Sequence, residues 1–328
     1  MSSSPVATDD RAAFLARNES RVPGDFEPGD DYFATPREPF GVLCLRLEIG
    51  PLCFVLNGLS DDQAAVLAKR FRPFVDTREK EVEEGAPAAD LTIRFARAGV
   101  DAFLAAPRGE AEFYRMGRRA TGSRIAIWSY EFAGTADIAQ GHADLALVDA
   151  DGPLFERGVE NFLRVLTALH ILKHGGLLVH AAGVVRHGLA HVFFGPSGSG
   201  KTTVTHLSLG DTILSDDLTL IVKAEDGYAA AGIPFGMAHH RVPDTNGCFP
   251  IAGLHRLVQS PEVRRERIFG AKALAEIACC LPFVMQDEPS AGAALAIATG
   301  VVSSVPIDRL LFRRDPSFWD VAQEAAGG

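Results

Sequence analysis

The sequence has no long uninterrupted hydrophobic run and no excess of positive charge. Among its 328 residues, no stretch of about 18 apolar residues could span a bilayer, and the alanine-rich residues 291–302 are expected to form a packed helix. Lys and Arg number 32 against 42 Asp and Glu, so the formal net charge is −10. A broad nucleic-acid surface needs clustered Lys and Arg to displace counterions. We therefore expect neither a membrane nor a nucleic acid among the partners.

Cysteine is scarce, and an export signal is not evident. The cysteines form an odd set without a C-x-x-C pair, which suggests neither a disulfide framework nor a zinc site: Cys44, Cys53, Cys248, Cys279 and Cys280. Residues 1–10 lack the basic start and the apolar core of a signal peptide. These features favour the cytoplasm as the compartment.

The length predicts two domains, by a soft prior of about 100–200 residues per domain. Residues 1–36 are rich in Ser, Asp, Pro and Gly and predict a poorly ordered tail. Residues 37–152 predict a β-rich α+β domain with one helix, which Ser60 caps. Its expected strands cover residues 41–47, 52–56, 91–95, 112–116, 123–132 and 145–148. Apolar residues at helical spacing then predict a linking helix over 154–173, which opens a second domain, residues 153–328.

The strongest motif follows a predicted buried strand. Residues 192–203 read Val-Phe-Phe-Gly-Pro-Ser-Gly-Ser-Gly-Lys-Thr-Thr, which contains the G-x-x-x-x-G-K-T pattern of a phosphate-binding loop. Its glycines let backbone N–H groups turn toward phosphate oxygens, Lys201 supplies a positive charge, and the Thr202 hydroxyl is placed to reach Mg²⁺. The predicted binding residues are Gly195, Pro196, Ser197, Gly198, Ser199, Gly200, Lys201, Thr202 and Thr203. The alternative is a glycine-rich turn before an ordinary helix.

A histidine is expected beside this loop. Residues 177–185 and 189–194 are apolar runs joined by a predicted two-residue turn, which pairs Arg186 with Leu189. The same register places His180 opposite Gly195, at the edge of the phosphate site. The alternative is a core histidine whose partners are backbone groups.

Two carboxylates are expected at the same place. Residues 212–215 predict a strand that runs into Asp216 and Asp217. If this strand is parallel to the loop strand, as a helical crossover requires, its carboxyl end emerges beside the phosphates. An acidic turn is the alternative, and it is disfavoured because residues 218–222 also read as strand.

The C-terminal part of the chain is expected to contribute mainly structural elements and few catalytic residues. The sequence predicts helices over 271–281 and 316–323 and a strand over 305–312. Residues 236–241 are a candidate lining of an acceptor pocket, with a solvated loop as the alternative. We expect Arg309, Arg313 and Arg314 to lie on a solvated face.

The combination of His180, the loop and Asp216-Asp217 resembles the HPr kinase/phosphorylase family, of which phosphoenolpyruvate carboxykinases are distant relatives. The serine-kinase-like homologues in peptide-modifying gene clusters look more similar still. The resemblance covers roughly residues 177–321 and implies an α/β fold, with a P-loop kinase domain after the β-rich α+β domain. It implies that Lys201 and the loop bind ATP, and that His180 lies near the transferred phosphate. It also implies that Thr202 and Asp217 bind Mg²⁺ and that Asp216 is the base.

The chain departs from the family at three places. Thr203 stands where the family has an acidic residue, the helix after the loop is shorter, and residues 230–234 replace a Glu-Arg-Gly-type stretch. The resemblance therefore implies neither dephosphorylation nor HPr as the substrate.

The expected function is ATP- and Mg²⁺-dependent transfer of the γ-phosphoryl group to a hydroxyl, most simply a Ser or Thr of a peptide or protein. Two alternatives stay open: a non-catalytic ATP-binding module that couples nucleotide to partner assembly, and a small-molecule kinase acting, for example, on free serine. A homo-oligomer is compatible with the sequence.

Overall fold

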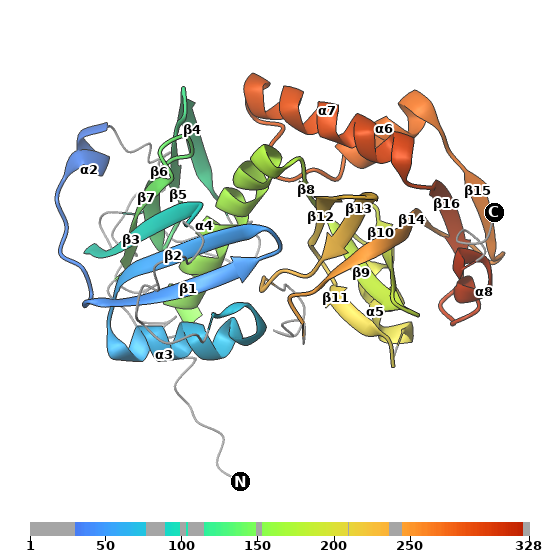
Figure 1. The fold of residues 1–328 in the computed structure, drawn as a ribbon, viewed down its shortest axis with the longest axis horizontal. Coiled ribbons are helices and arrows are strands. Elements are labelled where there is room, and N and C mark those ends of the chain that lie inside the picture. The colour runs from blue at the N-terminus through green and yellow to red at the C-terminus, as the bar shows by residue number, and fades with distance from the viewer. Residues whose placement is uncertain are drawn as a thin grey trace, which may run out of the picture. The chain divides into compact units, whose positions relative to one another are not determined.

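The computed structural model describes residues 30–76, 89–98, 103, 115–148, 153–208, 210–235 and 245–323. The chain is a mixed α/β protein with two sheets (Figure 1). It divides into two compact units. The first contains Cys53–Lys69 and the described parts of Met1–Leu47 and Asp76–Leu166. The second contains the described residues from Thr167 onward, together with Glu48–Leu52 and Arg70–Val75.

The first unit is built on a seven-stranded sheet in the order β1-β2-β3-β7-β6-β5-β4. Its strands are β1 (Leu43–Ile49), β2 (Leu52–Leu59), β3 (Leu91–Ala98), β4 (Gly117–Thr121), β5 (Arg124–Trp128), β6 (Phe132–Asp137) and β7 (His142–Val148). The central β2, β3 and β7 run parallel, and β7 to β4 form an antiparallel meander. The parallel centre and antiparallel edge explain why this half combines crossover segments with hairpins.

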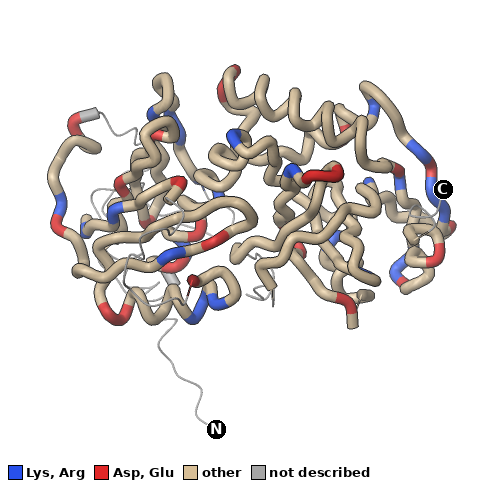
Figure 2. The backbone as a smooth tube through the Cα atoms, viewed as in Figure 1, with Lys and Arg blue, Asp and Glu red and all other residues tan. Residues whose placement is uncertain are grey.

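Two helices of the chain, α3 (Asp61–Arg70) and α4 (Pro153–His170), begin close to where the sequence indicates. Ser60 Oγ accepts the Gln63 N–H, and the Ser60 N–H donates to Gln63 Oε1, both at 3.3 Å, which is a capping box for α3 (Asp61–Arg70). Acidic residues start α3 and basic residues end it, as its dipole favours (Figure 2). The longer helix α4 (Pro153–His170) covers the predicted linking segment.

Several expectations for this half need correction. Residues 30–34, assigned to the tail from composition, form α2, because Tyr32 and Phe33 pack against a buried hydrophobic cluster of this unit. The predicted strand 123–132 is two strands, β5 and β6, because the chain turns between Trp128 and Phe132 to pair with itself. The predicted strand 112–116 falls mostly outside the described residues. The compact units divide inside α4, between Leu166 and Thr167.

The second unit is built on a nine-stranded sheet in which β11-β9-β10-β14-β13-β12-β8 are successive neighbours and β16 joins β14 to β15. Its strands are β8 (Leu177–Val179), β9 (Ala181–Arg186), β10 (Leu189–Phe194), β11 (Thr212–Ser215), β12 (Thr219–Ala224), β13 (Gly227–Ala231), β14 (Cys248–Gln259), β15 (Arg264–Arg267) and β16 (Ile307–Phe312). Its helical segments are η1 (Arg72–Phe74), η3 (Ile171–His174), α5 (Lys201–Leu207), α6 (Gly270–Ala278), α7 (Glu288–Ser304) and α8 (Phe318–Ala322).

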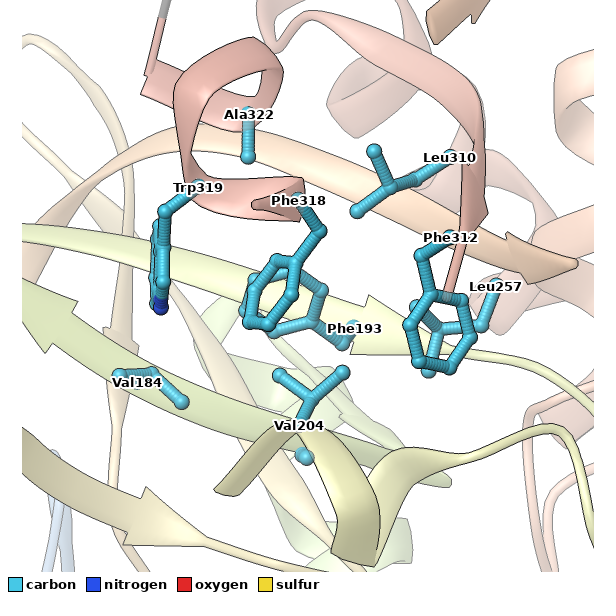
Figure 3. Packing of buried hydrophobic residues seen from close by; sticks show 10 residues of the cluster. Val184, Phe193, Val204, Leu257, Leu310, Phe312, Phe318, Trp319 and Ala322 are labelled. Atoms are coloured by element: carbon cyan, nitrogen blue, oxygen red, sulfur yellow. The ribbon is translucent and has the colours of Figure 1, made fainter. Parts of the chain in front are cut away.

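The core of this unit lies directly beneath the glycine-rich segment. Val204 of α5 and Phe193 of β10 pack with the aromatic side chains of the C-terminal strand and helix, Phe312, Phe318 and Trp319 (Figure 3). All five are buried, and the Phe193 and Phe318 rings meet edge to face at 5.9 Å. The apolar end of the chain therefore supports the strand and helix that hold the loop between them.

Among the helices of the described residues, none combines the length and the apolar character that crossing a membrane requires.

Candidate functional site

The glycine-rich loop, residues 195–200, connects the buried strand β10 to α5, and residues 201–203 of the motif form the start of that helix. Gly195, Gly198 and Gly200 have φ values of 153°, 76° and 111°, which side chains disfavour, so the loop's backbone path depends on glycine. A Cβ on Gly200 would overlap the ring of Phe312, so this glycine is also needed for packing. Gly200 is the N-cap of α5, which places the helix N-terminus at the loop.

The lysine of the loop turns inward. Lys201 is only 8% exposed, and its Nζ donates to the carbonyl oxygens of Gly195 at 3.0 Å and Pro196 at 3.3 Å. Burial lowers the pKa of Lys201, while the nearby charge of Asp217 acts to raise it. The ammonium group thus lies within the loop, where it is poised to meet an anion.

The strands around the loop have the predicted directions. Six pairs of β9 and β10 partners follow the register predicted from the two-residue turn, from Leu189 with Arg186 to Phe194 with Ala181. β11 is also antiparallel to β9, so β10 and β11 run in the same direction on either side of it. Their carboxyl ends therefore lie at the same end of the sheet, as the crossover through α5 requires.

The apolar run 177–185 is two strands and not the single strand expected from sequence. β8 and β12 continue the ladder of β9 and β11, since Ser215 with Gly183 and Thr219 with Val179 share one register. The ladder is interrupted between these pairs: the first strand bends at His180 and the second at Asp216 and Asp217. The acidic pair therefore lies in a bend, the alternative that the sequence disfavoured.

The two bends bring an imidazole and a carboxylate together. His180 Nε2 lies 2.8 Å from Asp217 Oδ1, and the two side chains are 38% and 19% exposed. The backbone N–H of His180 donates to the Cys280 carbonyl oxygen at 2.7 Å, which fixes the first bend. The negative charge of Asp217 also acts to raise the pKa of Lys201, which places Asp217 near the loop. His180, Asp217 and Lys201 thus lie beside the loop, with Lys201 buried and the other two side chains partly exposed to solvent.

The second bend is held by a serine. Ser215 Oγ accepts the N–H groups of Asp217 at 3.2 Å and Leu218 at 3.0 Å, so a side chain replaces the interrupted ladder bonds. Asp216 precedes Asp217 in this bend and is half-buried. Because the strand ends before them, the two aspartates are not constrained to alternate across a sheet.

The structure adds residues that the motif does not contain. Gln259 Nε2 donates to the Gly198 carbonyl oxygen at 2.7 Å, and the Cys280 thiol accepts the Gly195 N–H. Burial raises the pKa of the Cys280 thiol. These residues lie more than 50 positions after the loop, and the parallel pairing of β14 with β10 carries no local sequence signal. The only hint of these residues in the sequence is the largely hydrophobic segment that forms β14 (Cys248–Gln259), because Gln259 is its last residue.

The donor set suits a nucleotide phosphate and Mg²⁺. The buried Ser199 Oγ has no hydrogen-bond partner among the described residues, so its hydroxyl is available to donate to a phosphate oxygen. The hydroxyl of Thr202 and the carboxylates of Asp216 and Asp217 are hard oxygen donors, which Mg²⁺ prefers. Pro196, Ser197 and Gly198 are exposed, and Thr202 and Thr203 are half-buried, so this segment is open to a ligand.

Other sequence assignments turn out differently. Arg309, expected on a solvated face, donates to Glu276 at 2.6 Å, because α6 presents a carboxylate to β16. The predicted helix 271–281 ends at Ala278, in α6. The segment 230–234 begins within the buried strand β13 and provides no carboxylate. Residues 236–241, the candidate acceptor lining, lie outside the described residues.

Comparison with protein-family models and with curated proteins finds no match for this chain. The fold therefore defines the class on its own: a mixed α/β protein with two sheets and helices.

Proposed function

We propose that this protein is an ATP- and Mg²⁺-dependent kinase with a P-loop domain of the HPr-kinase type, which transfers the γ-phosphoryl group to a hydroxyl of a peptide or protein. The observation that supports this most is the meeting of Asp217, His180 and Lys201 at the glycine-rich loop. A phosphate-binding loop alone would serve any nucleotide-binding protein. Phosphoryl transfer also needs a carboxylate close to the phosphates. Asp217, which is fixed by hydrogen bonds to Ser215 and His180, is the candidate for it.

The proposed chemistry uses few side chains. Lys201, the loop N–H groups and the α5 N-terminus bind and orient the phosphates, while Asp216 takes the proton from the acceptor hydroxyl. Asp217, held by His180, supports the metal together with Thr202. When bound, Mg²⁺ neutralises part of the phosphate charge. Positioning and electrostatics supply most of the rate in this class of reaction, because little covalent chemistry is needed.

Two other functions use the same loop. A non-catalytic ATP-binding module needs no base, and the ordered Asp216-Asp217 bend favours the kinase over it. A small-molecule kinase needs the same catalytic groups and differs only in its acceptor, so the described site does not separate it from a peptide kinase.

The test is ADP release from ATP and Mg²⁺, measured with no acceptor, with free serine, and with Ser- and Thr-containing peptides. Intact mass of the acceptors is recorded in parallel. Acceptor-dependent ADP release with a matching mass gain in a peptide supports the proposal. A gain with free serine alone assigns the small-molecule alternative. ATP binding without release in any mixture assigns the binding module.

A further inference from the structure

An arginine of the neighbouring strand lies against the first glycine of the loop. β14 is the neighbour of β10 in the sheet and pairs parallel with it (Figure 1). The register of this pair places Arg256 beside Phe194, the last residue before the loop. Arg256 Nη1 lies 3.0 Å from the position that a Cβ on Gly195 would occupy. The guanidinium group therefore packs on the loop backbone, in space that only glycine leaves open.

The orientation of this guanidinium is fixed by hydrogen bonds. Its Nε donates to Glu276 Oε2 at 2.9 Å, and its Nη1 donates to the Leu257 carbonyl oxygen at 2.6 Å. Glu276 is itself held by Arg309, whose Nη2 donates to Oε1 at 2.6 Å. Within the part of the chain that the structure describes, these bonds engage Nε and Nη1 of Arg256. The Nη2 donors are left for a ligand.

The charge balance also points to an anion. Burial alone would raise the pKa of Glu276, but hydrogen bonds from Arg309 and Arg256 lower it, so Glu276 is ionised at neutral pH. One carboxylate is thus shared by two arginines. Burial is the main cause that lowers the pKa of Lys201; Asp217 acts to raise it, and Arg256 acts more weakly to lower it, so Lys201 and Arg256 repel each other at the loop. A polyphosphate that contacts both cations would offset this repulsion.

We propose that Arg256 is a second phosphate-binding cation of the loop, which contacts the polyphosphate of a nucleoside triphosphate through its Nη2 group, and that Glu276 is its positioning residue. This proposal rests on the proposed function for the identity of the ligand. The geometry fits a polyphosphate at the loop whether or not phosphoryl transfer follows. A planar guanidinium with a preset orientation is suited to binding phosphate oxygens at low entropic cost.

Arg309 provides the matched control, because it shares Glu276 but lies on β16, on the far side of β14 from the loop strand. We therefore compare Arg256→Gln, Arg256→Lys and Arg309→Gln. The ligands are ATP, AMP and inorganic tripolyphosphate, and dissociation constants are measured by titration calorimetry. The thermal midpoint of each ligand-free variant reports on folding.

Arg256→Gln should weaken ATP and tripolyphosphate binding by about tenfold or more, the usual effect of one charge-assisted hydrogen bond. AMP binding should change by less than about twofold, because AMP lacks the outer phosphates. Arg256→Lys should recover part of the loss, since the charge remains without the fixed fork. Arg309→Gln should leave all three affinities within about twofold, because the other oxygen of Glu276, Oε2, keeps its hydrogen bond from Arg256 Nε.

Equal losses in Arg256→Gln and Arg309→Gln would show that the Glu276 network acts only through folding, and the proposal would be wrong. Unchanged tripolyphosphate binding in a folded Arg256→Gln variant would also overturn it, while leaving the kinase proposal intact. Conversely, if Arg256→Gln selectively loses tripolyphosphate binding while the wild-type protein transfers no phosphoryl group, Arg256 is a phosphate-binding residue and the kinase proposal is wrong.

Discussion

The imidazole of His180 and the carboxylate of Asp217 lie 2.8 Å apart although 37 residues separate them in the chain. They meet because two paired strands bend at the same level, His180 in one and Asp217 in the other. Asp217 therefore cannot be considered apart from its histidine partner. Substitution of His180 therefore removes the partner that orients the Asp217 carboxylate.

Lys201→Ala should remove most of the rise in melting temperature that ATP and Mg²⁺ produce. The ammonium group is the buried cation of the loop, and ligand-dependent stabilisation follows the affinity of the folded state. Thermal unfolding with and without nucleotide measures this. A stabilisation that persists in Lys201→Ala and in a Gly198→Ala/Gly200→Ala double variant would contradict a P-loop.

Substitution of the two aspartates should impair different properties of the protein. Asp216→Asn should keep the affinity for ATP and Mg²⁺ while lowering transfer by about 10²–10⁴-fold, the usual contribution of a positioned base. Asp217→Asn should weaken the magnesium dependence of nucleotide binding as well. Nucleotide affinity with and without Mg²⁺, measured beside transfer, tests both. Loss of magnesium-dependent binding in Asp216→Asn alone would mean that the roles are reversed.

Two glycines of the loop should differ in their contribution to stability. Gly198→Ala strains a left-handed backbone but meets nothing within 4 Å, so the cost should be roughly 1–2 kcal/mol. Gly200→Ala adds an overlap with the buried ring of Phe312, worth about 1–3 kcal/mol more. Urea unfolding of the two variants measures the difference. Equal costs would show that the Phe312 contact is absent in solution.

His191 should make the protein sensitive to acid. Burial, with repulsion from His255 and Arg186, lowers its pKa to about 3. The unfolded chain binds this proton below about pH 6.5, so stability is lost as the pH falls from about 6.5 toward 3, by up to about 1.4 kcal/mol per pH unit. His191→Phe should flatten this slope between pH 4 and 6, measured by urea unfolding. An unchanged slope would show that His191 titrates normally.

The features that the sequence predicts correctly are local ones, or are fixed by a tight turn. The loop residues and the His187-Gly188 turn are contiguous signals, and the turn fixes the register of β9 and β10. The capping box at Ser60 is likewise local. These features could be placed without any knowledge of the rest of the chain.

Most of what the sequence does not predict arises from pairing between distant segments. The bend at His180 is held by the carbonyl oxygen of Cys280, 100 residues later in the chain. The bend at Asp216 and Asp217 is local and is held by the Ser215 hydroxyl, but the strand periodicity does not reveal it. Arg256 reaches the loop only because β14 pairs parallel with β10. Parallel pairing has no turn to reveal its register.

The most direct test of the kinase is phosphoryl transfer by wild-type protein and Asp216→Asn under identical conditions. Both are incubated with ATP, Mg²⁺ and a Ser-containing peptide library, and the peptides are analysed by intact mass. We predict that wild-type protein adds one phosphoryl group to a subset of peptides and that Asp216→Asn, with the same ATP affinity, adds it at least about 100-fold more slowly. Equal transfer by both proteins, or ATP binding by both with transfer by neither, would contradict the account.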